Sequence, residues 1–232
     1  MRDKSAQDVQ QLWPIPLATA QFDQAADVNP VLARMFQAMR ATDPQNESKA
    51  RFYSSRDDLL QRIEIPEFQA LMQFFVGALQ KTVSGVNANV WPAGRMSMQL
   101  KLAGCWFQIQ NGEAFHDVHT HGNCSWSGVY YVQVDPAAQR VRHPTLGALN
   151  GATRFYGPWH QYLGGAYMDM GNAFLQQSTR DVMPEAGTLV MFPSFLQHKA
   201  MPYAGEQDRI IVSFNAQFHA AGGNQIFDYA GT

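Results

Sequence analysis

Residues 187–218 read GTLVMFPSFLQHKAMPYAGEQDRIIVSFNAQF, and this stretch decides the fold because it holds two strand patterns on either side of one histidine. The first pattern, GTLVMFPS, is rich in residues that favour strands and leads to His198. The second begins at Arg209 and alternates apolar with polar side chains, which is the period of a half-buried strand. Its apolar side holds Ile210, Val212 and Phe214, and its polar side holds Arg209, Ser213 and Asn215.

The same period of two extends back along the chain to about residue 97. The segments SMQLKLAG (97–104), CWFQIQ (105–110) and SGVYYVQV (127–134) each have the composition or the alternation of a strand. Gln108 and Gln110 share a face with Trp106 on the second of these segments. That face either turns toward a binding pocket or is a solvated polar face.

The first 92 residues have a helical period instead. Asn29 followed by Pro30 is typical of a helix start, and Pro66 opens a second helix whose apolar stripe runs from Phe68 to Val83. We therefore expect an α+β chain of one domain, residues 1–232. In it, a mainly helical part (1–92) packs against a β-barrel or jelly-roll core (93–220).

One stretch of the expected core, residues 137–186, has neither period and is rich in glycine, tyrosine and tryptophan. Long irregular insertions in compact domains are usually functional segments. We expect this insertion, with Tyr156, Trp159, Tyr162 and Tyr167, to cover a pocket as a lid that selects the substrate.

Composition excludes several classes of function. A formal net charge of −2 gives no basic surface for nucleic acid, and no apolar run approaches the roughly 20 residues of a membrane span. The start of the chain lacks the pattern of a secretory signal, and Cys105 and Cys124 give no disulfide framework. We expect a cytoplasmic protein, with its oligomeric state left open.

The segment FHDVHTHGN (115–123) concentrates three of the seven histidines. Residues two apart on an extended chain project to the same face, so His119 and His121 can chelate one ion. His116 cannot share that face if the strand is regular. A divalent transition metal bound by imidazoles usually takes a third protein ligand, and His198 is the candidate from the later strand.

These segments resemble one protein family. HTHGNCSWSGVYYV (119–132) followed by GTLVMFPSFLQHKAMPYAGEQDRIIVSFN (187–215) is similar to the 2-oxoglutarate and Fe(II)-dependent oxygenases, in particular the bacterial and phage branch that resembles prolyl hydroxylases. The resemblance implies a double-stranded β-helix (jelly-roll) core, Fe(II) as cofactor and 2-oxoglutarate as cosubstrate. It also implies hydroxylation of a small-molecule or protein substrate.

Carried over by position, the resemblance makes His119 and His198 iron ligands. Arg209 would pair with the distal carboxylate of 2-oxoglutarate, and Tyr131 would donate a hydrogen bond to that carboxylate. A guanidinium that forks onto a carboxylate, with a phenol beside it, is chemically suited to this role. Gln108 is a further candidate for contact with the cosubstrate.

The chain departs from the family pattern at His121, where the family usually has an acid. Asp117 or Glu113 could supply the missing carboxylate ligand. His121 would then contact one of the ligands instead of binding the metal itself. The alternative enzyme is a three-histidine Fe(II) dioxygenase of the cupin type that does not use 2-oxoglutarate. The third interpretation is a jelly roll that binds a metal and catalyses no reaction.

Overall fold

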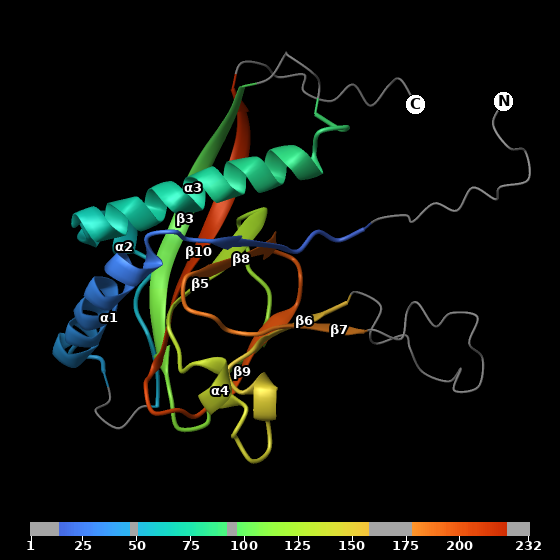
Figure 1. Ribbon diagram of the computed structural model, residues 1–232. Helices are drawn as coiled ribbons and strands as arrows, with labels where there is room; N and C mark the ends of the chain where they lie inside the picture. Colours follow the sequence, from blue (N-terminus) through green and yellow to red (C-terminus); the bar gives the residue numbers. More distant parts are fainter. Residues whose placement is uncertain (1–13, 47–50, 92–96, 158–177, 222–232) are drawn as a thin grey trace, which may run out of the picture.

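The computed structural model describes residues 14–46, 51–91, 97–157 and 178–221, and within them it contains two antiparallel sheets (Figure 1). The larger sheet has the order β1-β8-β5-β10-β3-β2 and the smaller has the order β4-β9-β6-β7. The larger sheet consists of β1 (Ala18–Gln21), β2 (Phe52–Ser54), β3 (Ser97–Gln110), β5 (Trp126–Gln133), β8 (Thr188–Pro193) and β10 (Arg209–Ala221). The smaller consists of β4 (Ala114–His119), β6 (Thr153–Tyr156), β7 (Thr179–Val182) and β9 (His198–Tyr203).

The two sheets pack face to face. A small apolar cluster joins them, in which Phe155 of the smaller sheet packs against Phe192 of the larger with ring centroids 4.9 Å apart. Two facing antiparallel sheets whose strands alternate along the chain form a jelly roll, or double-stranded β-helix. The expected α+β fold class is confirmed.

Helices cover the other face of the larger sheet (Figure 1). They are α1 (Ala25–Thr42), α2 (Leu59–Arg62) and α3 (Pro66–Val86), the last beginning at Pro66 as the sequence predicts. Phe75 of α3 packs on Phe214 of β10 with ring centroids 4.7 Å apart, and Phe36 of α1 stacks on Phe107 of β3. No helix among the described residues has the length and apolarity needed to cross a bilayer.

The first helix begins earlier than Asn29, so the expected cap was wrong. Helix α1 starts at Ala25, and Pro30 lies inside it. Asn29 is buried, and its Oδ1 accepts a hydrogen bond of 2.7 Å from the Tyr130 hydroxyl. A buried phenol needs a hydrogen-bond partner, and Asn29 supplies it. The local preference of asparagine for a helix start is overridden by this tertiary contact.

The expectation of an irregular segment at 137–186 also needs correction. Besides the short helices α4 (Ala137–Arg140) and η1 (Gly147–Leu149), this stretch contains β6 and β7, which complete the smaller sheet. Each strand has only four residues, too few for a visible period of two. Trp159, Tyr162 and Tyr167 of the expected lid lie outside the described residues.

Gly128 offers a test of how the core packs. It lies opposite Phe214 in the pairing of β5 with β10, and a Cβ at this position would overlap the Phe214 ring. We expect Gly128→Ala to lower the free energy of unfolding by about 1–3 kcal/mol through overpacking. Chemical denaturation measures this loss.

Gly77 on the exposed side of α3 is the matched control, because a Cβ there meets no atom within 4 Å. Gly77→Ala should raise the free energy of unfolding by about 0.5–1 kcal/mol, since alanine favours a helix. Wild-type stability in Gly128→Ala would contradict the packing of Phe214 onto β5.

Candidate metal and cosubstrate site

A cavity between the two sheets collects side chains from both of them. His119, His121 and His198 line it together with Arg209, although these residues are far apart in the sequence. Gln108 and Thr153 contribute further polar groups. The sheet arrangement therefore brings a histidine cluster and a guanidinium into one enclosed space.

The three histidines converge on one point. His119 ends β4 and pairs with His198, which begins β9, and His121 follows two residues after the strand. One ligand atom from each of the three lies within 4.8 Å of the others. Nε2 of His121 is 3.3 Å from Nε2 of His198. This is the arrangement that the sequence predicted for the metal ligands.

Each of these imidazoles is held through its other nitrogen. Nδ1 of His119 lies 2.7 Å from the Asp117 backbone oxygen, and Nδ1 of His198 lies 2.9 Å from the Leu196 backbone oxygen. Nδ1 of His121 lies 2.8 Å from Oδ1 of Asn215. An oxygen acceptor requires the proton to be on Nδ1, so all three Nε2 atoms present lone pairs to the cavity.

Lone pairs that point at one place form an arrangement that can bind a cation. Two unprotonated Nε2 atoms at 3.3 Å repel each other unless a positive charge lies beside them. Burial lowers the pKa of His198 to about 3 and also lowers the pKa of His121, so both rings are neutral at ordinary pH. Neutral imidazoles suit iron, zinc, copper or nickel rather than magnesium or calcium.

His116 also lines the cavity, although we expected it to point away. It stacks on His119 with ring centroids 4.0 Å apart. The pairing of β4 with β9 shifts between His116 and His119. His116 pairs with Ala200 and His119 pairs with His198, so β4 has one more residue than β9 over this stretch. This β-bulge turns both histidines to one side. The expectation was wrong because it assumed a regular strand.

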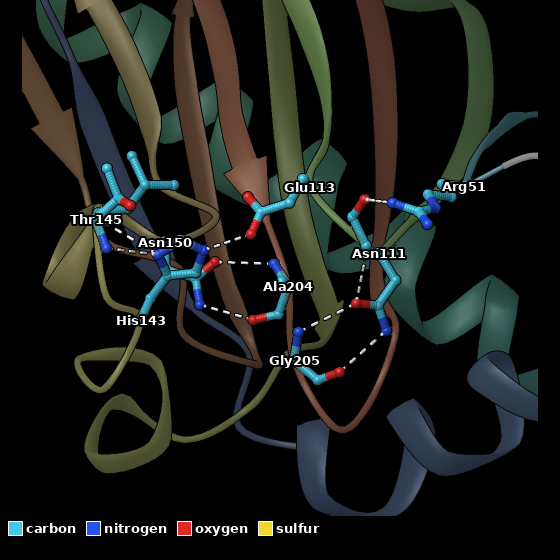
Figure 2. Close-up of polar contacts among 10 residues, drawn as sticks. Arg51, Asn111, Glu113, His143, Thr145, Asn150, Ala204 and Gly205 are labelled. Carbon is cyan, nitrogen blue, oxygen red and sulfur yellow. Dashed lines mark hydrogen bonds and ion pairs between the residues drawn. The ribbon is translucent and has the colours of Figure 1, made fainter.

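The acids considered for the metal site lie elsewhere. Asp117 is exposed, and its carboxylate accepts a hydrogen bond from the Val118 backbone N–H. Glu113 pairs with Nε2 of His143 at 2.8 Å in the turn at the end of β3 (Figure 2). Among the described residues, the candidate ligand cluster therefore contains histidines alone.

Arg209 is the second feature of the cavity. It is 1% exposed, so its guanidinium is buried and does not lie at the surface. Its Nε donates to the Gly151 backbone oxygen at 3.0 Å. Its Nη1 donates to Oε1 of Gln110 at 2.7 Å, and its Nη2 has no hydrogen-bond partner among the described residues.

Tyr131 and Gln108 lie near Arg209 and the histidines, respectively. The Tyr131 ring lies under the guanidinium, 5.1 Å from Cζ of Arg209, and its hydroxyl is 2.6 Å from Oγ1 of Thr153, which lines the cavity. Gln108 is 5% exposed, and its Nε2 lies 3.4 Å from Nδ1 of His116. The alternative of a solvated face for Gln108 is wrong.

Sequence reasoning missed the groups that hold the site residues in place, chiefly Gln110, Thr153 and Asn215. Gln110 and Asn215 both stand on the polar side of an alternating strand, and this signal was visible. Their partners were not visible, because strand register decides that Gln110 lies opposite Arg209 and that Asn215 lies opposite Ser127. Ser127 also donates to Oδ1 of Asn215, at 2.9 Å.

The fold and the site together define a class, the jelly-roll proteins with a histidine cluster that could hold a metal ion. Residues 104–215 match the model of the family described as "Putative 2OG-Fe(II) oxygenase", a range that includes both histidine segments and Arg209. This match covers just under half of the chain, which is similar to the 2-oxoglutarate and Fe(II)-dependent oxygenases over that range. No curated protein sequence matches it.

Solved structures of similar fold include a prolyl-4-hydroxylase from Pseudomonas putida, at 16% identity and a TM-score of 0.50 over 88% of this chain and 92% of that one. HygX from Streptomyces hygroscopicus, with nickel and 2-oxoglutarate bound, is similar at 11% identity and a TM-score of 0.55 over 88% and 82%. SnoN, a non-haem α-ketoglutarate-dependent epimerase from nogalamycin biosynthesis, is similar at 14% identity and a TM-score of 0.57 over 94% and 84%. At these identities the likeness shows the fold.

Asn215 allows a test of the metal centre that leaves the three histidines intact. Asn215→Ala removes the acceptor that orients His121, so we expect affinity for Ni(II) to fall by about 10–100-fold. Asn215→Asp keeps an oxygen acceptor at the same place and should keep most of the affinity. Calorimetric titration measures both variants.

The same titration on His121→Ala should show a larger loss than Asn215→Ala. Asp117→Ala is the control, since its carboxylate lies outside the cluster and its backbone oxygen remains. Equal loss in the Ala and Asp variants of Asn215, or wild-type binding in His121→Ala, would contradict the assignment.

Proposed function

We propose that the protein uses His119, His121 and His198 to hold Fe(II), and Arg209 to hold the distal carboxylate of 2-oxoglutarate, in an oxygenase reaction on an organic substrate. The observation that carries this proposal is the unpartnered Nη2 of a buried guanidinium in the cavity that three Nε2 lone pairs also face. A buried charge without a counterion is costly, and an anionic ligand compensates it.

A dicarboxylate is the ligand that reaches both groups. One carboxylate, with the neighbouring keto oxygen, would lie at the histidine end, and the other would accept from Arg209. Thr153 and Tyr131 supply hydroxyls beside the guanidinium, and we assign them to the same carboxylate. We also assign Gln108 to the cavity wall that the cosubstrate or substrate contacts.

When bound, Fe(II) supplies the activation of dioxygen, with 2-oxoglutarate oxidised to succinate and carbon dioxide as substrate is hydroxylated. The chain's own residues would bind the metal and the cosubstrate and orient them. Asn215 and two backbone oxygens keep the imidazoles directed at one point, and the guanidinium fixes the length of ligand that fits. The two sheets exclude water from the reaction.

The substrate class is part of the proposal. HygX has been solved with hygromycin B bound, and a prolyl hydroxylase from Trichoplax adhaerens with a peptide of hypoxia inducible factor, so similar folds take a small molecule or a protein segment. We propose one of these two classes for this chain. We also propose a cytoplasmic location, which is supported by the two cysteines being free thiols.

One observation favours a second candidate, the three-histidine Fe(II) dioxygenase. The candidate ligand cluster has no carboxylate, whereas the usual set for these iron enzymes is two histidines and one acid. In that reaction Arg209 would bind the carboxylate of the substrate itself. Binding of 2-oxoglutarate separates the two candidates.

Arg209→Gln is the decisive variant. Loss of a buried, charge-assisted contact should weaken 2-oxoglutarate binding by about 2–5 kcal/mol, while metal affinity stays near wild type. Titration of the Mn(II)-loaded protein under anaerobic conditions measures both affinities. Succinate formation from 2-oxoglutarate by the iron-loaded enzyme should fall in parallel.

Arg154 provides the matched control, because it is a partly buried arginine of β6 whose guanidinium is bidentate to Asp181. Arg154→Gln should lower stability and leave 2-oxoglutarate affinity unchanged. Wild-type affinity in Arg209→Gln would remove the cosubstrate assignment and favour the second candidate, or a jelly roll without turnover.

A further inference from the structure

Gln110 is the most deeply buried amide of the cavity region and contacts three strands. It is 0% exposed and ends β3. Its Nε2 donates to the backbone oxygens of Ala114 at 3.0 Å and Met201 at 3.5 Å, in β4 and β9. Because the amide nitrogen is committed to these two acceptors, Oε1 is directed at Arg209 of β10, 2.7 Å from Nη1.

A second anchor holds the same guanidinium. Nε of Arg209 donates to the backbone oxygen of Gly151, a residue with φ +75° whose Cβ would lie 2.6 Å from the Tyr203 ring. Only glycine fits this position without strain. With Nε and Nη1 both held, the plane of the guanidinium is set, and Nη2 is the group left for a ligand.

The β9–β10 connection that precedes Arg209 is held by side chains other than that of Gln110 (Figure 2). The Asn150 side chain makes two hydrogen bonds to the backbone of Ala204, of 2.8 and 3.0 Å. Asn111 makes two to the backbone of Gly205, of 3.1 and 3.2 Å. A change at residue 110 should therefore alter the Arg209 side chain rather than the place where β10 begins.

The residue type at position 110 also decides whether the positive charge of Arg209 is neutralised. A glutamate at this place would form an ion pair with Arg209 and cancel its charge. Glutamine accepts the same hydrogen bond and leaves the positive charge intact. Burial without a counterion lowers the pKa of Arg209, yet a guanidinium stays protonated in proteins.

We propose that Gln110 is a positioning residue that orients Arg209 without neutralising it, and so makes the site select 2-oxo acids that carry a second carboxylate. This inference rests on the proposed function, because it assumes that Arg209 receives the distal carboxylate. Gln110 is not among the residues that line the cavity, so we expect its effect to pass through Nη2 of Arg209.

The test compares two ligands that differ only at the distal end, 2-oxoglutarate and 2-oxopentanoate. Both are titrated anaerobically into Mn(II)-loaded wild type, Gln110→Glu and Gln110→Met. In Gln110→Glu, 2-oxoglutarate affinity should fall roughly tenfold or more, as expected for a lost hydrogen bond to a charged group. Affinities for 2-oxopentanoate and for Mn(II) should stay unchanged. Gln110→Met should show a smaller loss with the same selectivity.

Gln133→Glu is the matched control, since Gln133 donates to the backbone oxygen of Asp208, next to Arg209, and not to the groups that hold the guanidinium. It should leave the preference for 2-oxoglutarate as in wild type. An unchanged preference in Gln110→Glu, or an equal loss for both ligands together with Mn(II), would overturn the positioning role. If wild type binds no 2-oxoglutarate, the proposed function itself is wrong, and this result is distinct from the other two.

Discussion

A guanidinium stays charged at every ordinary pH, and the interior of this jelly roll places one beside no carboxylate of the described residues. The surrounding groups meet this constraint in three ways. Gly151 and Gln110 contribute oxygens, the Tyr131 ring contributes its face, and Nη2 is left without a hydrogen-bond partner among the described residues. Each of these groups comes from a different strand or loop, so the position of the charge depends on the whole sheet arrangement.

The strand β10 links this charge to the histidine cluster proposed to hold the metal. Its apolar side, which includes Val212 and Phe214, packs under the helices, and the opposite side faces the smaller sheet. That opposite side carries Arg209 at its start and Asn215 further along, so one strand positions both the proposed cosubstrate contact and the partner of His121. A slip of one residue would exchange these faces and lose both at once.

The sequence predicted the elements that have strong local signals. Alternation placed β10 and the end of β3, Pro66 marked the start of α3, and the spacing of His119 and His121 selected two histidines that lie together with His198. The failures share one cause, which is that tertiary contacts overrode local rules. Asn29 serves Tyr130 instead of capping a helix, and β6 and β7 are too short to carry a period.

The position of His116 could not be foreseen either, because one extra residue in β4 is invisible to a pattern that assumes regular pleating. The partners of the site residues were hidden for a related reason. Gln110, Thr153 and Asn215 act through strand register and sheet packing, which a single sequence does not specify.

The converging imidazoles have a further consequence for the protein itself. Backbone and amide oxygens direct one nitrogen from each of three imidazoles at the same point. Without a cation the nitrogen lone pairs in this corner of the barrel repel one another, and each ring would have a lower energy if it were turned away. A fold that holds these rings in place would give up some stability at this corner, and it would present a site already arranged for a cation.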